Sequence, residues 1–400
     1  MIGKKRKKNN SRGFVLPLIT ALIVILAFTG VGLLNLGQHA RLRSITTTAD
    51  IRARAAADAG LVQVIHLLNK KVDDDTIWNN DELPTMTDIA LPNSSETFSF
   101  TVTGTPSSFN IVSTGESVNA QRKVYSTTML KSVFNFAVAV QKNLSLYPNS
   151  AVTGYNSKSG KKDLKIQIGT NSVGDDSVIV MNGSSVNGDV YVGVGGDPAN
   201  VIRSKGTITG ETRDMPQEIY FPPVSPPESL FYKGFIKQSV TIIPFRSGEY
   251  SYINLGNSEV ITVDGGDVVL YVTGDVDLGN GAEIVIKAGS SLDVYIDGDW
   301  ISKEGAEITN EHGLASHFNL FGTGEPGQII ELKAKNEFYG TVYAPDASVG
   351  IKAGGDIFGS FVSNDFELKS KSTVYYDTEL AEVNIDDIGI YFTVNSWREE

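Results

Sequence analysis

The chain contains no cysteine among its 400 residues. This absence excludes a disulfide framework, a zinc–thiolate site and a thiol nucleophile, so stability has to come from burial and from hydrogen-bonded backbone. Histidine is also scarce, with four residues. Charged residues make up 20% of the chain and apolar residues 41%, which excludes disorder by composition and is sufficient for a large core.

Positive charge is scarce over most of the chain and concentrated at its start. The formal net charge is −12, and removal of the six basic residues within 1–13 would lower it to −18. Those six are Lys4, Lys5, Arg6, Lys7, Lys8 and Arg12. An acidic body repels nucleic acid, so no nucleic-acid partner is expected.

A long apolar run, residues 14–36, follows this basic leader, with Thr20, Thr29 and Asn35 as its polar members. At about 1.5 Å per residue it forms a helix of roughly 34 Å, enough to cross a hydrocarbon core about 30 Å thick. A cleaved secretory signal has a shorter core, about 7–15 residues, and a small-x-small cleavage site, which argues against that class. The basic cluster predicts a single-pass protein of the cytoplasmic membrane, with its N-terminus cytoplasmic and its bulk outside.

The helical pattern continues beyond the apolar run. Over residues 37–70, apolar or small residues recur at steps of three and four, the period of an α-helix. This pattern predicts an amphipathic continuation of the same helix, with one stripe packed on the domain behind it. The stripe consists of Leu42, Ile45, Ala49, Ala53, Ala56, Gly60, Leu61, Val64 and Leu68.

The junction "RGFVLPL", with the basic leader before it and the apolar run starting at Phe14, resembles type IV pilin-like proteins of bacteria. The segment "RARAAADAGL", which starts at Arg52, is similar to the Ala-rich stretch of PilX-type minor pilins. In that family a prepilin peptidase cuts after the glycine, here Gly13, and the new N-terminal residue, here Phe14, is usually methylated. The resemblance implies three partners: the membrane, the peptidase and other pilin-like subunits that pack on the helix.

Leu18 departs from the family pattern. Major pilins carry a glutamate five residues into the mature chain, which is the position of Leu18 here. That carboxylate neutralises the terminal amine of a neighbouring subunit in the apolar filament core, where an unpaired charge is expensive. Its loss suits a tip, priming or minor subunit, and it also suits an uncleaved membrane anchor.

β-Structure is predicted from about residue 97 onward, because "TFSFTVTG" and "SFNIVSTGESV" alternate apolar and polar residues. Residues 71–132 are predicted to form a small β-rich connecting segment, and residues 133–380 a β-solenoid. Between positions 151 and 370, glycine occurs at about twice its usual share of roughly 7%. This enrichment indicates frequent corners, where the backbone has to turn.

Repeats support the solenoid. "YVTGDVDLGNGAEI" from Tyr271 and "YIDGDWISKEGAEI" from Tyr295 match at an offset of 24. "FYGTVYAPDASVGIKAG" from Phe338 and "IFGSFVSNDFELKSKST" from Ile357 share a pattern at an offset of 19. A drifting period of this size is typical of β-solenoid coils whose inward residues stack on those of the next coil.

Two segments fall outside the repeat. The proline-rich residues 220–230 are predicted as a surface excursion or a junction between two solenoid parts, since proline cannot donate to a strand ladder. Residues 381–400 are predicted as a C-terminal cap that closes the stack or covers a strand edge. The stretch resembles uncharacterised β-solenoid domains behind PilX-type anchors and, more distantly, polymer-forming bactofilins. The predicted fold class is mainly β: a long N-terminal transmembrane and amphipathic helix, a small β segment and a right-handed β-helix.

No catalytic site is predicted in the solenoid. Polysaccharide hydrolysis needs paired aspartates with basic partners, whereas His312 and His317 lie five residues apart, without zinc-protease spacing, and are predicted as exposed loop histidines. The turn residues Asp264, Asp267, Asp275 and Asp277 suit calcium by chemistry but more commonly satisfy backbone groups. We therefore expect neither catalysis nor a cofactor or metal.

The sequence favours two functions over a third class, a polysaccharide-degrading enzyme. The first is a minor-pilin-like subunit of a type IV pilus or related filament, which displays the solenoid outside the membrane as a cap, spacer or adhesive surface. The second is an uncleaved, membrane-anchored surface protein whose solenoid binds envelope or extracellular polysaccharide.

Overall fold

The computed structural model describes residues 15–74, 82–105, 108–227, 229–334, 336–353, 355–382 and 390–400. The chain forms two compact units. The first comprises Met1–Leu68, Asn79–Thr128 and Val394–Glu400, and the second comprises Asn69–Trp78 and Met129–Thr393.

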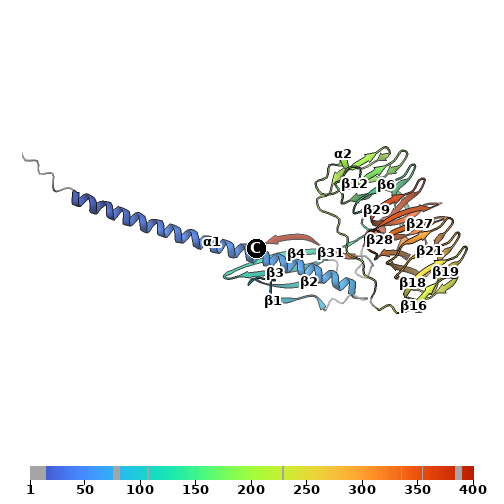
Figure 1. The fold of residues 1–400 in the computed structure, drawn as a ribbon, viewed down its shortest axis with the longest axis horizontal. Helices are drawn as coiled ribbons and strands as arrows, with labels where there is room; N and C mark the ends of the chain where they lie inside the picture. Colours follow the sequence, from blue (N-terminus) through green and yellow to red (C-terminus); the bar gives the residue numbers. More distant parts are fainter. Residues whose placement is uncertain are drawn as a thin grey trace, which may run out of the picture. The chain divides into compact units, whose positions relative to one another are not determined.

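The first unit consists of one long helix and an antiparallel sheet (Figure 1). Helix α1 spans Val15–Asp74, in agreement with the predicted continuous helix. The sheet has the strand order β1-β2-β3-β4-β31. Its strands are β1 (Met86–Ala90), β2 (Thr97–Thr105), β3 (Ser108–Ser117), β4 (Ala120–Ser132) and β31 (Ile390–Glu399). Alternating burial along β2 and β3 leaves one face apolar, and α1 packs on that face.

The C-terminal strand corrects one prediction. In the part of this segment that the structure describes, Ile390–Glu399 form β31, which is the outermost strand of the small sheet, beside β4, and does not close the solenoid stack. The Glu400 backbone N–H donates to the Lys123 carbonyl at 2.9 Å, and the Ser126 hydroxyl donates to the Ser396 carbonyl at 2.8 Å. The segment therefore covers a strand edge, which was its other predicted role. Its place in the sequence, after the solenoid, did not show that this edge belongs to the small sheet.

The second unit is a β-solenoid. Each coil contributes two or three short strands, and neighbouring coils pair in parallel. Examples are β20 (Asp267–Val272) with β23 (Ser291–Ile296), and β28 (Phe338–Ala353) with β29 (Ile357–Leu368). Within the described residues, a four-stranded sheet and a 22-stranded sheet surround the core.

The part of the solenoid before the proline-rich segment holds β5 (Val138–Val140), β6 (Leu144–Leu146), β7 (Ala151–Asn156), β8 (Lys161–Leu164), β9 (Ile166–Thr170), β10 (Val178–Val180), β11 (Ser185–Val186), β12 (Gly188–Val192), α2 (Pro198–Val201), β13 (Ile202–Ser204), β14 (Thr207–Ile208) and β15 (Thr212–Asp214). The part after it holds β16 (Tyr232–Ile236), β17 (Val240–Ile242), η2 (Pro244–Arg246), β18 (Gly248–Leu255), β19 (Val260–Val263), β20 (Asp267–Val272), β21 (Val276–Leu278), β22 (Glu283–Ile286), β23 (Ser291–Ile296), β24 (Trp300–Ser302), β25 (Glu307–Asn310), η3 (Ala315–His317), β26 (Phe318–Gly322), β27 (Ile329–Ala334), β28 (Phe338–Ala353), β29 (Ile357–Leu368), β30 (Thr373–Asp377) and η4 (Thr378–Ala381).

The strand register confirms the sequence repeats. Tyr271 pairs with Tyr295, as the first sequence repeat predicts. Phe338 pairs with Ile357, as the second one predicts. Gly340 lies opposite Gly359 in the same pair of strands, and a Cβ on Gly359 would lie 1.8 Å from the Gly340 carbonyl oxygen, so this coil contact depends on glycine.

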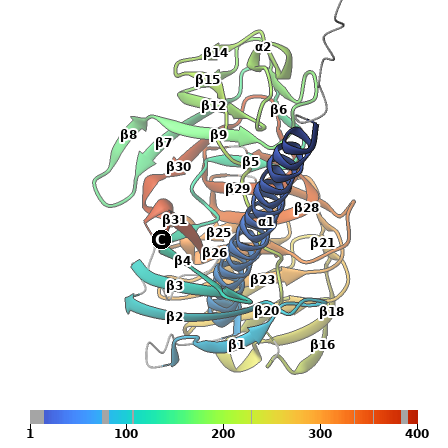
Figure 2. The same cartoon turned by 90° about the vertical axis from the view of Figure 1, so that its left-hand side faces the viewer.

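The coils do not stack in the order of the chain. Strand β29, near the C-terminal end of the solenoid, pairs with β6 (Figure 1) and with β5, the strands that open the solenoid. Strand β30 pairs with β7. From this seam, residues 138–214 build coils in one direction and residues 232–377 occupy the other. Figure 2 shows β29 and β30 beside β5 and β7. Polar contacts reinforce the seam, for example the Asn143 side-chain N–H to Asp365 Oδ1 at 2.7 Å.

The proline-rich segment joins the two ends of the stack. Residues 215–231 connect β15, which pairs with β12 at one end of the stack, to β16, which pairs with β18 at the opposite end. Ile219, Phe221 and Val224 pack on an outer apolar cluster that includes Phe321 and Tyr343. The Tyr343 hydroxyl donates to the Pro222 carbonyl at 2.7 Å. The segment thus lies along the solenoid wall and contains no described strand.

The solenoid core is continuous across the seam. Aliphatic residues from coils before and after the proline-rich segment belong to one buried cluster. Trp300, Phe318, Phe338 and Phe361 form an internal aromatic stack over successive coils, with neighbouring ring centroids 5.9–6.4 Å apart. This stacked core supplies stability without disulfides.

Candidate membrane-anchoring and assembly helix

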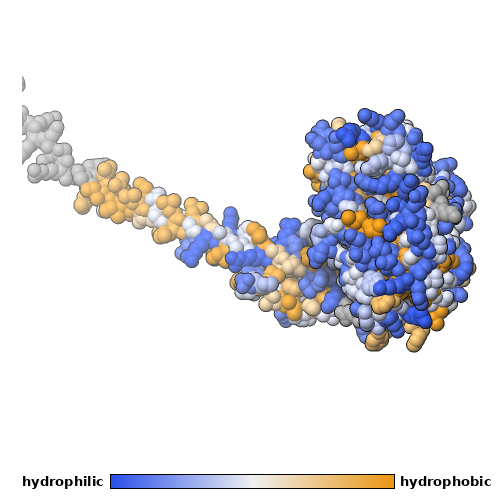
Figure 3. Space-filling view, turned by 45° about the vertical axis from the view of Figure 1, so that its right-hand side comes forward, coloured by the Kyte–Doolittle hydropathy of each residue, from blue (hydrophilic) through white to orange (hydrophobic). Residues whose placement is uncertain are grey.

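The first half of α1 presents apolar side chains that nothing in the described chain covers. The residues from Leu16 to Thr48 are exposed, apart from the partly exposed Gly30. The large apolar ones between 16 and 36 are Leu16, Leu18, Ile19, Leu22, Ile23, Val24, Ile25, Leu26, Phe28, Val31, Leu33, Leu34 and Leu36. Figure 3 shows them as an orange surface along this part of the helix. The helix is long and apolar enough to cross a membrane.

The threonines in this run are compatible with an apolar environment. The Thr20 hydroxyl donates to the Leu16 carbonyl, and the Thr29 hydroxyl donates to the Ile25 carbonyl, each at 3.0 Å. Both hydroxyls are therefore satisfied within their own helix, as the interior of a bilayer requires.

The predicted site residues lie around the start of this helix. Gly13 and Phe14, the predicted cleavage and methylation positions, lie outside the described residues. Leu18 lies in the first turns of α1 with 64% of its surface exposed. At this position the helix thus presents a hydrocarbon side chain to its surroundings rather than a carboxylate.

The second half of α1 packs closely on the small sheet. Its buried side chains are Ala49, Ala53, Ala56, Ala57, Leu61, Val64 and Leu68. A Cβ on Gly115 of β3 would lie 2.0 Å from the Ala53 carbonyl oxygen and 2.3 Å from the Ala57 nitrogen, both of them backbone atoms. A Cβ on Gly60 would lie 2.2 Å from the Ser113 hydroxyl oxygen. The Ala-rich sequence therefore allows a close helix–sheet approach that larger side chains would prevent.

Two members of the predicted stripe do not take part. Leu42 and Ile45 remain 59% and 52% exposed, so the prediction that they pack on the following domain is wrong. The stripe is buried only from Ala49 onward, where the sheet begins to cover it. The helical period of the sequence identifies the apolar face of α1, but it does not show where along the helix the covering sheet ends.

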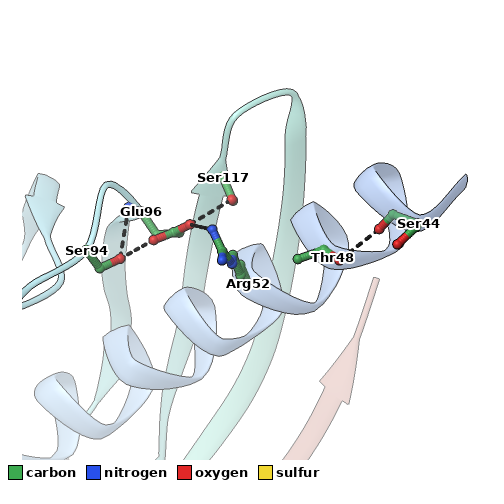
Figure 4. Close-up of polar contacts among 6 residues, drawn as sticks. All are labelled: Ser44, Thr48, Arg52, Ser94, Glu96 and Ser117. Atoms are coloured by element: carbon green, nitrogen blue, oxygen red, sulfur yellow. Dashed lines mark hydrogen bonds and ion pairs between the residues drawn. The ribbon is translucent and has the colours of Figure 1, made fainter. Parts of the chain in front are cut away.

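A buried carboxylate ties the sheet to the helix. Figure 4 shows Glu96, which precedes β2, between Ser94, Ser117 and Arg52 of α1. The Arg52 Nη1 lies 3.4 Å from Glu96 Oε1, and the Ser117 hydroxyl donates to the same oxygen at 3.1 Å. The Ser94 hydroxyl donates to Oε2. Sequence reasoning missed this group, and the only signal for it was a lone acid in the turn "PNSSETF" directly before an alternating strand.

Hydrogen bonds lower the pKa of Glu96 to about 2. The largest contribution comes from the Ser94 hydroxyl, with smaller ones from its own backbone N–H, Ser117 and Arg52, while burial acts in the opposite direction. The carboxylate is therefore ionised at any physiological pH.

This depressed pKa predicts an acid-sensitive helix–sheet contact. Because the folded pKa lies below the ordinary value of 4.5, the stabilisation is fully present above that pH and is lost as the pH falls towards about 2. We expect the protection of amides in β2 and β3, corrected for the pH dependence of intrinsic exchange, to fall over this window in the wild-type chain and to depend less on pH in Glu96→Gln. Hydrogen-exchange mass spectrometry on the full chain in detergent measures both.

The control for this prediction is Glu116→Gln, which removes a carboxylate at an exposed position of the same sheet. Equal pH profiles for Glu96→Gln and the wild type would contradict the role of Glu96.

Surface ion pairs join the helix to the sheet edges. Arg122 of β4 lies 3.1 Å from Asp50, and Arg54 lies 3.3 Å from Glu399 of β31. The Arg54 guanidinium also lies 5.4 Å from the centre of the Trp397 ring. Exposed pairs of this kind contribute about 0–1 kcal/mol each, so they orient the helix more than they stabilise it.

The solenoid residues singled out in the sequence lie in separate places. His312 and His317 stack with ring centroids 3.9 Å apart; His312 is exposed and His317 half-buried. Burial and, second, His312 lower the pKa of His317, whereas Asp267 raises it. Asp293 of β23, which the sequence did not single out, is buried and accepts a hydrogen bond from the Asn319 amide at 2.7 Å; burial raises the pKa of Asp293 to about 6.

The four turn aspartates do not converge. Asp275 accepts the Asp299 backbone N–H at 2.9 Å, and Asp267 accepts the Ser291 hydroxyl at 2.7 Å. Asp277 lies on a coil face in register with Asn254 and Ile301, and Asp264 is exposed. Among the described residues, no group of three His, Cys, Asp or Glu side chains could hold a metal ion.

Comparisons with known proteins give limited matches. A search of curated proteins found no match. Among solved structures, the competence-associated pilin ComZ from Thermus thermophilus is 14% identical, with 88% of this chain and 98% of that chain covered and a TM-score of 0.23. The glycosylated ice-binding protein LeIBP from an Arctic yeast is 14% identical, with 61% and 91% covered and a TM-score of 0.31. The DUF3494 domain of a Shewanella frigidimarina ice-binding protein is 13% identical, with 61% and 95% covered and a TM-score of 0.26. Residues 237–383, less than half of the chain, match the model described as "Domain of unknown function (DUF7305)".

Proposed function

We propose that the chain is a minor-pilin-like subunit whose N-terminal helix inserts in the cytoplasmic membrane and then packs with other pilin-like helices. The observation that carries this proposal is the division of α1. Residues 16–48 present their side chains to the surroundings, while residues 49–68 are fixed to an antiparallel sheet through small side chains. An exposed apolar helix firmly attached to a folded domain can exchange lipid for neighbouring helices.

The absence of a carboxylate at Leu18 supports a minor rather than a bulk subunit. A neighbouring subunit's terminal amine would find no partner there, and an unpaired charge among apolar helices is expensive. Gly30 and Gly32 leave open space on the helix, where no atom lies within 4 Å of an added Cβ, so another helix can approach closely. In this role the solenoid is a non-catalytic domain displayed outside the membrane as cap, spacer or adhesive surface.

Mass spectrometry of the N-terminal peptide, from native membranes and from sheared surface fractions, tests this proposal. We expect a mature chain that begins at N-methylated Phe14, produced by a prepilin peptidase that cuts after Gly13. An intact leader with Lys4 to Arg12 attached would contradict the pilin pathway. It would favour the membrane-tethered surface protein instead.

Leu18→Glu tests the role of the missing carboxylate. We expect it to increase the fraction of the protein in sheared filaments several-fold, because the new carboxylate pairs with a neighbouring amine. The control is Leu22→Glu, which places a carboxylate one turn further along α1, where no amine partner is expected. Its cost of membrane insertion is the same, about 2.5–3.5 kcal/mol or less. Quantitative immunoblots of sheared and cellular fractions give the ratio. An equal response of the two variants would contradict a specific role for position 18.

A further inference from the structure

A row of lysines crosses successive coils on one face of the solenoid. Lys333 of β27 pairs in register with Lys352 of β28. The pairing of Ile351 with Leu368 places Lys369 next in the row, and the pairing of Leu368 with Leu146 places Tyr147 after it. Adjacent coils lie about 4.8 Å apart. Like charges directly opposite one another in a sheet are destabilising, so this row is unfavourable for folding alone.

Two of these lysines have a glutamate two residues earlier on the same strand. Glu331 lies 3.9 Å from Lys333, and Glu367 is paired with Lys369. In the coil between them, Gly350 pairs in register with both glutamates and takes the place of a third one. Within the described ranges, Lys352 has no carboxylate within ion-pair distance. The repeated Glu-x-Lys pattern is thus interrupted at its middle coil.

The missing side chain leaves a hollow of about 280 Å³. Its walls include Lys333, Lys352, Lys369, Tyr147, Glu331 and Gly350. The Lys369 Nζ lies 5.2 Å from the centre of the Tyr147 ring, and the Tyr147 hydroxyl donates to Glu367 Oε1 at 3.3 Å. Lys369 is half-buried, and burial lowers its pKa, but Glu367, Tyr147 and Glu331 together raise the pKa above its ordinary value, so the ammonium stays charged.

We propose that this hollow binds a carboxylate-bearing sugar unit of a linear acidic polysaccharide, whose carboxylate occupies the place left by Gly350 and pairs with Lys352. The hollow has room for one sugar ring and is lined by Tyr147, three lysines and the carboxylate-bearing Glu331. Glutamates pair with Lys333 and Lys369, so Lys352 supplies the ammonium that is left for a ligand. One lysine per coil, about 4.8 Å apart, matches the rise of roughly one sugar unit in an extended chain that runs along the solenoid. Ammonium–carboxylate hydrogen bonds are shorter and stronger than those between neutral groups.

This proposal goes beyond the assembly role and does not depend on leader cleavage. A solenoid with this groove suits an adhesive surface on a filament and equally a membrane-tethered protein. Failure of the N-terminal processing test would leave it intact, and failure of the binding test would leave the pilin assignment intact.

Calorimetric titration of the full chain in detergent with oligogalacturonate at low salt tests the proposal. Methyl-esterified oligogalacturonate serves as the uncharged counterpart. We expect the acid form to bind at least tenfold more tightly than the ester. Lys352→Gln should weaken binding about tenfold, as expected for one charged hydrogen bond. Gly350→Glu should abolish binding because its carboxylate restores the repeat and fills the hollow.

Two control variants distinguish binding in the hollow from general effects of charge or of substitution. A Cβ on Gly350 would lie 3.5 Å from the Lys369 Cε, an ordinary contact, so Gly350→Ala should keep binding within a few-fold. Lys205→Gln removes an exposed lysine elsewhere on the solenoid and should leave binding unchanged within twofold. No binding by the wild type, equal binding of the ester, or equal losses in the Lys205 and Lys352 variants would overturn the proposal. The same variant pattern with inorganic polyphosphate would show a general anion groove and overturn the sugar assignment.

Discussion

Replacement of Gly115 by valine is expected to detach helix α1 from its sheet. Even the first added carbon would lie 2.0 Å from the Ala53 carbonyl oxygen and 2.3 Å from the Ala57 nitrogen, and neither backbone atom can rotate away. We expect the free energy of unfolding of this unit to fall by about 3 kcal/mol or more, at the upper end of overpacking effects. Hydrogen exchange of α1 residues 49–68 and of β3, measured on the full chain in detergent, reports the change locally.

The control is Thr114→Val in the same strand. Thr114 is not fully buried and alternates with the inward-facing residues Ser113 and Gly115. We expect a change of less than about 0.5 kcal/mol there. If Gly115→Val left exchange in α1 unchanged, the close helix–sheet contact would not be what holds the anchor to its domain.

Replacement of Trp300 by alanine is expected to destabilise the solenoid by about 3–5 kcal/mol, as for other buried large aromatic residues. Trp300 is fully buried and begins the internal aromatic stack with Phe318. Its indole N–H donates to the Ser302 hydroxyl at 3.1 Å, and Ser302 is itself fully buried. The variant therefore leaves a cavity and also an unpaired polar group. Denaturant unfolding followed by exchange in β23–β27 measures the loss.

Two further variants in this strand separate the contribution of the buried ring from that of the hydrogen bond. Trp300→Phe keeps a ring in the stack but loses the hydrogen bond, so its effect should be about 1–3 kcal/mol, between that of alanine and the wild type. Ile301→Ala, in the same strand on the outer side, should have the smallest effect. Equal losses for Trp300→Ala and Ile301→Ala would show that the aromatic stack is not central to the core.

Features encoded at short range could be predicted from the sequence. The offsets of Tyr271 to Tyr295 and of Phe338 to Ile357 became the strand register, because coils of nearly equal length repeat their corners and inward residues at the same spacing. The long helix followed from its period. The right-handed winding of the solenoid, the absence of catalysis and the processing at Gly13 stay predictions.

Features that depend on distant partners could not be predicted. No local pattern indicates that β29 pairs with β5, or that β31 joins β4 rather than the solenoid. The exposure of Leu42 depends on where the sheet ends, and the low pKa of Glu96 depends on hydroxyls brought together by the turn and by β3. The lysine row can be recognised only from the strand register, which aligns Lys333, Lys352 and Lys369.

The seam between the first and last coils has a consequence for biosynthesis. A chain that emerges N-terminus first delivers β5 and β6 long before β29, which pairs with them, has been made. During that interval the strand edges of the first coil are open, and such edges recruit other chains. The high contact order also makes closure of the stack slow. The early coils therefore need protection until residue 377 has emerged, and any stop before that point yields a product with a permanently open edge.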